Sequence, residues 1–160
     1  MQVLVGFGAN LGDPVAAFRV ALAALGERSR LVDVSSLYRS APHGPPQPHY
    51  LNLAALLDVD EPPLALLEHC QALEAAAGRD PSREQRWGPR VLDLDLLLAH
   101  GLVHRSPRLL LPHPLLAERA FALVPAAELA PTWVHPLVGR TIGELARAVD
   151  DPSLERVGRI

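Results

Sequence analysis

Apolar and polar residues follow one another along this chain in short blocks that predict strands and helices. The shorter apolar and β-rich blocks have the length of strands, and two longer blocks have the length of helices. We expect strands at residues 3–7, 31–38, 51–59 and 92–98. One helix, residues 14–25, is expected between the first two strands, and a second, residues 64–77, between the last two. Asp13 and Pro14 fit the N-cap and the first position of the first helix, and Gly78 ends the second.

The order β-α-β-β-α-β is that of a split-βαβ unit, so the sequence predicts an α+β fold of the ferredoxin-like type, an antiparallel sheet with helices packed on it. Three short C-terminal helices, separated by prolines, are expected at residues 115–120, 124–129 and 141–148. With 160 residues and no linker or repeat, the chain is expected to be a single domain, residues 1–160. Two loops, 39–50 and 78–91, are long for such a domain, and long loops are commonly functional.

Composition excludes several classes of protein. Hydrophobic residues make up 49% of the chain and charged residues 21%, which is typical of a globular protein. A net charge of -3 disfavours a general nucleic-acid binder, and no apolar stretch is long enough to cross a membrane. The lone cysteine, Cys70, is expected to fill the core rather than react, and it excludes an internal disulfide framework. Met1 leads directly into an apolar segment, so we expect no signal peptide and a cytoplasmic location.

All fifteen basic residues are arginine, and the chain contains no lysine. A Walker-type phosphate loop and a Schiff-base mechanism both require lysine, so both are excluded. If the protein handles phosphate, arginine and metal must bind it.

Asp93 and Asp95 lie two residues apart in the apolar run that is predicted to be the last strand. Alternate residues of a strand share one face, so the two carboxylates would repel each other. A pair of this kind can converge on Mg²⁺, which prefers oxygen ligands, or can be neutralised by salt bridges near a strand end. Spacing alone leaves both interpretations open.

Four arginines precede these acids within a dozen residues: Arg79, Arg83, Arg86 and Arg90. Arginine binds phosphate oxygens bidentately, so an arginine loop next to metal-binding acids is typical of a polyphosphate site. The alternative is a solvated loop whose arginines pair with Asp80 and Glu84.

Other side chains have two interpretations each. Trp87 is either a core anchor or an exposed indole that stacks on a flat ring. His113 can donate to a phosphate oxygen or assist proton transfer. Asn52, close to Tyr50, either reads the edge of a heterocycle or caps a strand. His100 and His104 are four residues apart but have no further ligand, so a zinc site is not expected.

Three other functions share some of these sequence features. The segment Gly6–Gly12, with Asp33 about twenty residues later, superficially fits a dinucleotide-binding fingerprint, but its glycine spacing is wrong and strands and helices do not alternate after it. A metal-dependent nuclease or nucleotidyltransferase would also use two nearby aspartates, but would need a broader basic surface. A non-catalytic ferredoxin-like binding module would need no metal-binding acids.

The segment Arg86-Trp-Gly-Pro-Arg-Val-Leu-Asp-Leu-Asp-Leu-Leu resembles the signature of the 6-hydroxymethyl-7,8-dihydropterin pyrophosphokinase family. Supporting matches, in family order, are Gly8-Ala-Asn-Leu-Gly, Ser35-Ser-Leu-Tyr-Arg, Tyr50-Leu-Asn and Leu111-Pro-His. The resemblance implies a cytoplasmic, monomeric enzyme of folate biosynthesis that transfers pyrophosphate from ATP to the pterin hydroxymethyl oxygen and releases AMP. It also implies that Asp93 and Asp95 hold two Mg²⁺ ions that bridge the triphosphate.

The same resemblance implies three further sets of residues, some of them shared. Those that act in catalysis with the two aspartates are Arg79, Arg83 and Arg90. Those that contact ATP are Gln71, Glu74, Trp87, Arg90, Leu96, Arg108, His113 and Arg119. Those that form the pterin pocket are Ser40, Ala41, His43, Tyr50, Asn52, Asp93 and Phe121.

The chain departs from the family pattern at three places. Pro114 stands where the family often has an aromatic residue, which affects one ATP contact. The loop 80–85 offers only Arg83 where a basic pair is common, which bears on loop closure and phosphate capture. Ala41 and His43 replace a commoner Pro and Leu in a loop that binds pterin largely through its backbone.

Overall fold

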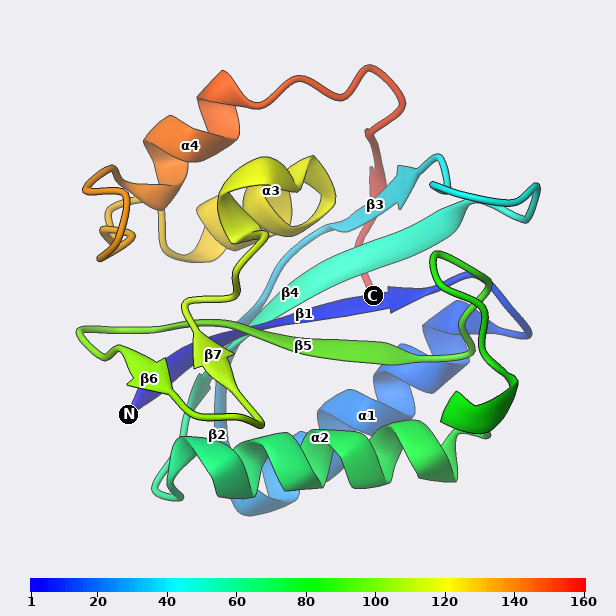
Figure 1. Ribbon diagram of the computed structural model, residues 1–160, viewed down its shortest axis with the longest axis horizontal. Helices are drawn as coiled ribbons and strands as arrows, with labels where there is room; N and C mark the ends of the chain where they lie inside the picture. Colours follow the sequence, from blue (N-terminus) through cyan, green and yellow to red (C-terminus); the bar gives the residue numbers. More distant parts are fainter.

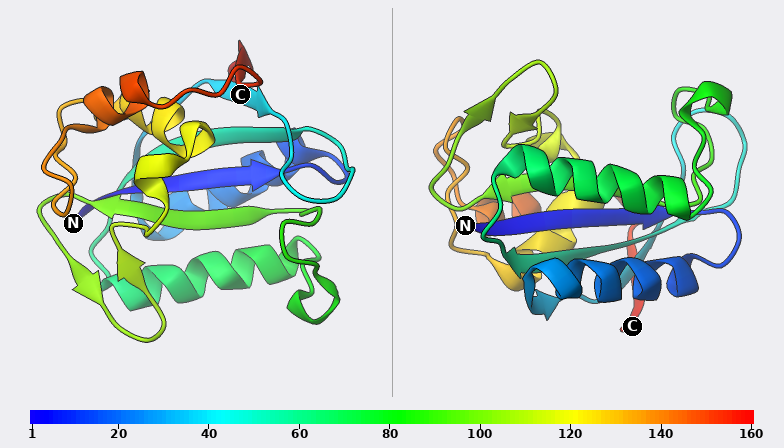
Figure 2. Two further views of the ribbon diagram at one scale, coloured as in Figure 1. Left: turned by 45° about the horizontal axis from the view of Figure 1, so that its top comes forward. Right: turned by 90° about the horizontal axis from the view of Figure 1, so that it is seen from below.

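The computed structural model describes residues 1–160, which form one antiparallel sheet with helices on both faces (Figures 1 and 2). Its strands are β1 (Gln2–Ala9), β2 (Arg30–Val34), β3 (Leu37–Ser40), β4 (Tyr50–Asp58), β5 (Asp93–Ala99) and β8 (Glu155–Gly158). The strand order is β5-β1-β4-β3-β8, and β2 also pairs with β4. The predicted ferredoxin-like α+β class is confirmed, because the first and last predicted strands are neighbours and every pair is antiparallel.

The predicted strand 31–38 is wrong as a single element, because the structure divides it into β2 and β3. Ser35 and Ser36 separate them. The Ser35 N–H donates to the carbonyl of Ala54, and the Ser35 hydroxyl accepts from the Ala54 N–H at 2.8 Å. A side chain thus takes the place of a main-chain acceptor in the ladder, which interrupts the strand while both halves stay on β4.

One face of the sheet is covered by α1 (Pro14–Arg28) and α2 (Pro63–Ala76). The Asp13 side chain accepts from the N–H of Ala16 at 3.1 Å, as expected of the N-cap. Phe18 of α1 and Leu66 and Cys70 of α2 pack with the inward side chains of β1 and β4 in a core cluster of 21 residues. Cys70 is a core filler, as predicted.

The other face is covered by α3 (Ala120–Leu129) and α4 (Ile142–Ala148), which form a second core cluster with Leu4, Leu97 and Leu98. The predicted helix 115–120 is wrong in type and length, since only a short 3₁₀ turn, η2 (Leu116–Glu118), forms there. The predicted helix 124–129 begins earlier, at Ala120. Pro125 lies inside this helix, and the burial of its apolar neighbours offsets the hydrogen bond that proline cannot donate.

Two features were not predicted. A small hairpin joins β6 (His104–Arg105) to β7 (Leu110–Leu111), and β8 pairs with β3 at the edge of the sheet. These strands are too short or too polar for hydrophobic periodicity to reveal them. No helix of the chain has both the length and the apolar character to span a membrane.

Candidate active site

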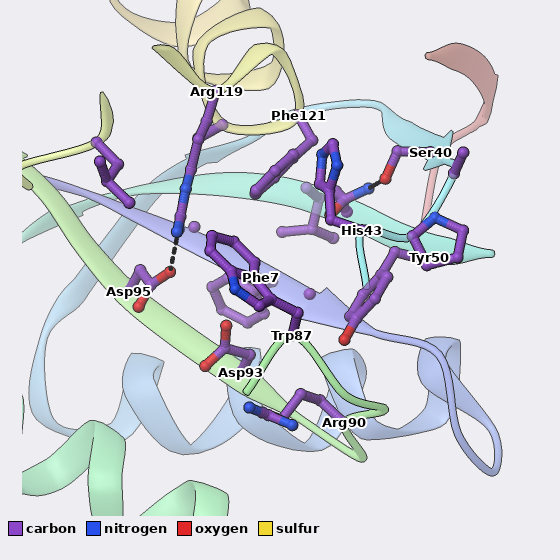
Figure 3. A pocket seen from close by; sticks show the side chains of 18 of the residues that line it. Phe7, Ser40, His43, Tyr50, Trp87, Arg90, Asp93, Asp95, Arg119 and Phe121 are labelled. Carbon is purple, nitrogen blue, oxygen red and sulfur yellow. Dashed lines mark hydrogen bonds and ion pairs between the residues drawn. The ribbon is translucent and has the colours of Figure 1, made fainter. Parts of the chain in front are cut away.

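An open pocket of about 400 Å³ lies at the end of the sheet where β1 ends and β4 and β5 begin (Figure 3). Its walls come from the loop 41–49, the loop 78–92 and the start of α3. Twelve residues singled out from the sequence line it: Ser40, Ala41, His43, Tyr50, Asn52, Arg86, Trp87, Arg90, Asp93, Asp95, Arg119 and Phe121. Segments far apart in the sequence therefore meet in one cavity.

Asp93 and Asp95 lie on the same face of β5 and point into the pocket, while Leu94 and Leu96 pack on the opposite side in the core beneath α1 and α2 (Figure 3). About a third of each carboxylate side chain is exposed, 35% and 33% respectively. Because the Leu96 side chain is buried in that core, only its backbone remains for the predicted ATP contact.

Positive groups partly neutralise the two acids. Nη1 of Arg79 lies 2.9 Å from Oδ1 of Asp93, and Nη1 of Arg119 lies 3.9 Å from Oδ2 of Asp95. Desolvation at the base of the pocket and the negative charge of Asp93 nevertheless raise the pKa of Asp95. Both acids therefore form ion pairs, as the salt-bridge interpretation expects, but Asp95 is only partly compensated.

The donor set fits Mg²⁺ that arrives with a nucleotide. No group of three or more His, Cys, Asp and Glu side chains lies together to hold a metal ion. Mg²⁺ is usually bound by one or two carboxylates, with phosphate and water oxygens completing the octahedron. Asp93 and Asp95 supply that partial set and leave the remaining positions to a ligand.

The arginine loop carries its own acidic partners. Arg79 bonds to Glu74 and, at 2.7 Å, to Glu84, and Arg90 lies 3.2 Å from the same carboxylate of Glu84. Burial raises the pKa of Glu74, which also accepts from the N–H of Leu94. Arg83, by contrast, is 88% exposed and pairs only with Asp80. The loop arginines Arg79, Arg83 and Arg90 thus pair with Asp80 and Glu84, the alternative that the sequence left open.

Seven of the predicted residues do not line the pocket: Arg79 and Leu96, described above, and five others. Glu74 is buried below it, and Arg83 extends into solvent beside it. Gln71 is exposed on α2, and Arg108 pairs with Glu68 at 2.9 Å. Nδ1 of His113 accepts from the N–H of Leu115, and burial lowers the His113 pKa, which leaves a neutral ring with Nε2 as its donor.

The polar end of the pocket is formed by β3 and β4. Nδ2 of Asn52 donates to the Ser40 hydroxyl at 2.8 Å, and Oδ1 lies on the side of Gly8. The strand-cap interpretation of Asn52 is wrong, since the residue lies inside β4 and pairs with Gly8. Tyr50 donates from its hydroxyl to the carbonyl of Gly88 at 2.8 Å, which connects β4 to the arginine loop.

Aromatic rings form the remaining walls. Trp87 is 45% exposed, so its interpretation as a core anchor is wrong. Its ring centroid lies 6.4 Å from that of His43, and Phe121 lies on the α3 side of the same cavity (Figure 3). Exposed rings across a narrow cavity are suited to hold a flat heterocycle by stacking.

Sequence reasoning missed several lining residues: Gly6, Phe7, Gly8, Pro42, Leu53, Gly88, Leu97, Leu115 and Ala122. The two glycines of β1 are the most informative of them. Gly6 lies opposite Asp95 and Gly8 opposite Asp93, so bare backbone flanks both acids. Glycines at alternate positions of a strand were a usable signal, because glycine in a strand often marks a close approach by a ligand. The antiparallel sheet around them excludes the dinucleotide-binding alternative.

Comparisons with known proteins agree with one family. The sequence model described as 7,8-dihydro-6-hydroxymethylpterin-pyrophosphokinase matches residues 4–131. A 2-amino-4-hydroxy-6-hydroxymethyldihydropteridine pyrophosphokinase of Methylorubrum extorquens is 42% identical over 159 residues, which cover 98% of each chain. The protein of the same name from Pseudomonas aeruginosa is 44% identical over 160 residues, covering 98% of this chain and 96% of that one.

Solved structures share the fold at low sequence identity. A crystal structure of HPPK-DHPS in complex with substrates has a TM-score of 0.71 and 11% identity and covers 97% of this chain. Wild-type Plasmodium falciparum HPPK-DHPS with pteroate has a TM-score of 0.70, 11% identity and the same coverage. The chain spans only 46% and 47% of these two structures, so they bear on the fold alone.

Proposed function

The chain belongs to the 7,8-dihydro-6-hydroxymethylpterin-pyrophosphokinase family, and we propose that its pocket performs the reaction of that family at Asp93 and Asp95. The enzyme transfers pyrophosphate from ATP to 6-hydroxymethyl-7,8-dihydropterin in folate biosynthesis and releases AMP. The observation that carries the proposal is the single cavity in which two carboxylates, arginines and aromatic walls meet.

Asp93 and Asp95 are proposed to hold two Mg²⁺ ions together with the triphosphate. Their side chains share one face of β5 and remain partly exposed, and the raised pKa of Asp95 indicates a site that favours an added positive charge. When bound, the metal would neutralise phosphate charge and orient the triphosphate for in-line attack on the β-phosphorus.

Arginines are proposed to stabilise the charge that develops on the phosphates. Arg90 and Arg119 line the pocket on either side of the acids, and Arg79 contacts Asp93 from below. Arg83 is exposed, so it can act only if its loop moves toward the pocket. Guanidinium groups remain charged at all relevant pH values, which suits a site without lysine.

The pterin is proposed to lie between the aromatic walls and the end of β4. The Ser40 hydroxyl accepts from the Asn52 amide nitrogen, which leaves Oδ1 of Asn52 as an acceptor for donors on a ring edge. Trp87 and Phe121 offer ring faces for stacking. Ala41 and His43 complete this side with the loop backbone.

The remaining ATP contacts are proposed to lie outside this pocket. Gln71 and Glu74 lie near the C-terminal end of α2, Arg108 precedes β7, and His113 follows β7. Action as a monomer is part of the proposal. We retain a cytoplasmic location as part of the proposal.

A nuclease or a binding module fits the site less well. The pocket has the volume of a small-molecule site, and aromatic side chains enclose it. A polynucleotide enzyme would need an extended basic surface, whereas several arginines of this loop are paired with acids. A simple binding module gives no reason for two partly exposed carboxylates on one strand.

The direct test is to incubate the protein with ATP, Mg²⁺ and 6-hydroxymethyl-7,8-dihydropterin and to measure AMP. We expect AMP in a one-to-one ratio with pyrophosphorylated pterin, and neither product without the pterin. Calorimetric titration with ATP, with and without Mg²⁺, separates the alternatives. ATP binding that is absent, or equally tight without metal, would count against the proposal.

A further inference from the structure

One carboxylate oxygen lies between two arginines of the proposed phosphate site. Oε2 of Glu84 is 2.7 Å from Nε of Arg79 and 3.2 Å from Nε of Arg90. Arg90 forms no ion pair with any other acid of the chain. The oxygen therefore bridges two guanidinium groups that come from opposite ends of the same loop.

This contact differs from the ion pairs on the protein surface. The side chains of Arg79, Arg90 and Glu84 are 21%, 15% and 17% exposed, whereas those of Arg83 and Asp80 are 88% and 50% exposed. Ion pairs shielded from water are screened less by salt and hold their geometry better than exposed pairs. The Glu84 bridge is thus a partly buried feature of the site.

The geometry is that of an arginine-bound phosphate oxygen. Phosphate groups in proteins are commonly held by guanidinium N–H groups from more than one arginine, with charge-assisted bonds of this length. Glu84 accepts a hydrogen bond from Nε of Arg79 and forms an ion pair with Arg90, whose other guanidinium nitrogens donate to the carbonyls of its own loop. A polyphosphate that binds these two arginines must therefore compete with the Glu84 carboxylate. Glu84 and the incoming anion are both negative, and they cannot share the position without repulsion.

Displacement of Glu84 would also affect its neighbours in the loop. Glu84 directly follows η1 (Pro81–Arg83), the short turn that carries the exposed Arg83. Glu84 connects this turn to the floor of the site through Arg79, which itself bonds to Asp93. Release of Glu84 removes that anchor and leaves the turn free to move.

We propose that Glu84 is an internal occupant of the phosphate subsite, which the polyphosphate of ATP displaces from Arg79 and Arg90, and that its release frees the turn that carries Arg83. The proposal rests on the proposed function, because it takes these arginines to be the ones that bind phosphate. Glu84 is a positioning residue in this scheme, since it acts through the two arginines and touches no substrate.

The test compares the wild type with Glu84→Gln in calorimetric titrations with a non-hydrolysable ATP analogue and Mg²⁺. Glutamine keeps the size of the side chain but removes its charge, so the two arginines are less strongly held. We expect the analogue to bind about fivefold more tightly to Glu84→Gln, the factor expected when a partly buried ion pair no longer competes. In turnover assays KM for ATP should fall by a similar factor while KM for the pterin is unchanged.

Glu61→Gln is the matched control, because Glu61 pairs with Arg28 at 2.8 Å on a remote surface. Its affinity for the analogue should equal that of the wild type. Glu84→Asp keeps the charge on a shorter side chain, and its affinity should lie nearer to that of the wild type than to that of Glu84→Gln. Wild-type-like or weaker binding by Glu84→Gln would overturn the proposal, while failure of the wild type itself to bind the analogue would overturn the proposed function as well.

Discussion

The side-chain amide of Asn10 donates a hydrogen bond to Oε1 of Gln47 over 2.9 Å, and this bond joins the two loops that enclose the site. Oδ1 of Asn10 accepts from the N–H of Arg90 at 2.9 Å, while Nε2 of Gln47 donates to the carbonyl of Trp87 at 2.7 Å. Buried Asn10 therefore holds the arginine loop by its backbone and the proline-rich loop through Gln47.

Replacing Gln47 with alanine should uncouple the loops without unfolding the chain. Gln47 makes several hydrogen bonds but is only half-buried, so each lost bond costs about 1 kcal/mol. We expect kcat/KM for the pterin to fall about tenfold or more, with a melting temperature lowered by several degrees and a chain that is still folded at the assay temperature. His49→Ala, in the same loop, changes an exposed side chain without a hydrogen bond and should behave like the wild type. Unchanged kinetics in Gln47→Ala would show that the loops do not need this connection.

Asp95→Asn should lower activity while it stabilises the metal-free protein at high pH. Desolvation and the charge of Asp93 raise the pKa of Asp95 to about 7, whereas an aspartate in the unfolded chain titrates near 3.9. The folded state thus holds its proton more tightly, and the wild type loses stability as pH rises from about 4 through about 7. Asparagine has no charge to desolvate, so it avoids this loss.

The measurement is the melting temperature in EDTA at pH 5 and pH 8. Asp95→Asn should melt higher than the wild type at pH 8, and the difference should shrink at pH 5. Turnover with Mg²⁺ and ATP should fall by about a hundredfold or more if the carboxylate helps to hold the metal. The exposed Asp60→Asn serves as control. A gain in stability that is equal at both pH values would contradict the assignment of the effect to ionisation.

Gly8→Ala should weaken pterin binding with little effect on folding. A Cβ at Gly8 would lie 3.6 Å from Oδ1 of Asn52 and 3.8 Å from the ring of Tyr50, both ordinary contact distances. The methyl group therefore fits the fold but projects into the pocket. We expect KM for the pterin to rise several-fold and KM for ATP to change less.

Gly26→Ala provides the contrast. Gly26 lies near the end of α1, where a Cβ would meet nothing within 4 Å. Alanine is favoured over glycine in a helix by about 1 kcal/mol, so this variant should resist urea better than the wild type and turn over at the same rate. A loss of activity in Gly26→Ala would point to an effect of α1 on the site.

Trp87 should report pterin binding by its fluorescence. It is half exposed in the pocket, whereas the other tryptophan, Trp133, stacks on His100 at 4.6 Å outside it. A pterin that stacks on Trp87 should quench its emission, so Trp87→Phe should lose the ligand-dependent change and Trp133→Phe should keep it. Quenching that survives in Trp87→Phe and disappears in Trp133→Phe would place the ring elsewhere.

The parts of the fold that local pattern determines were predictable. Caps such as Asp13 and apolar runs such as 92–98 depend on neighbouring residues, and the structure confirms the first helix and the last strand nearly at the expected bounds. The break at Ser35 was not predictable, because it depends on a hydrogen bond to Ala54 on another strand. The start of α3 at Ala120 depends on burial against the sheet, which the prolines of that region concealed.

The candidate site was predictable as a set of residues but not as an arrangement. The sequence placed Asp93 and Asp95 on one face, and the structure confirms this. It left open whether the arginines bind phosphate or pair with acids, and in the structure Arg79 and Arg90 pair with Glu84. Which donors an arginine uses depends on the loop conformation and on the ligand present, and neither is encoded in residue spacing.

The glycines of β1 have a consequence for inhibitors. Across from Asp93 and Asp95 the floor of the pocket is main chain, and Gly6 and Gly8 present hydrogen atoms there. A compound that lies on this floor contacts main-chain atoms, which every substitution retains. Any substitution at Gly6 adds a Cβ 3.2 Å from the side chain of Leu97, so escape by mutation at this position would disturb the packing of the same pocket. Drug resistance would therefore arise less easily at Gly6 than at Gly8, where a methyl group fits the fold.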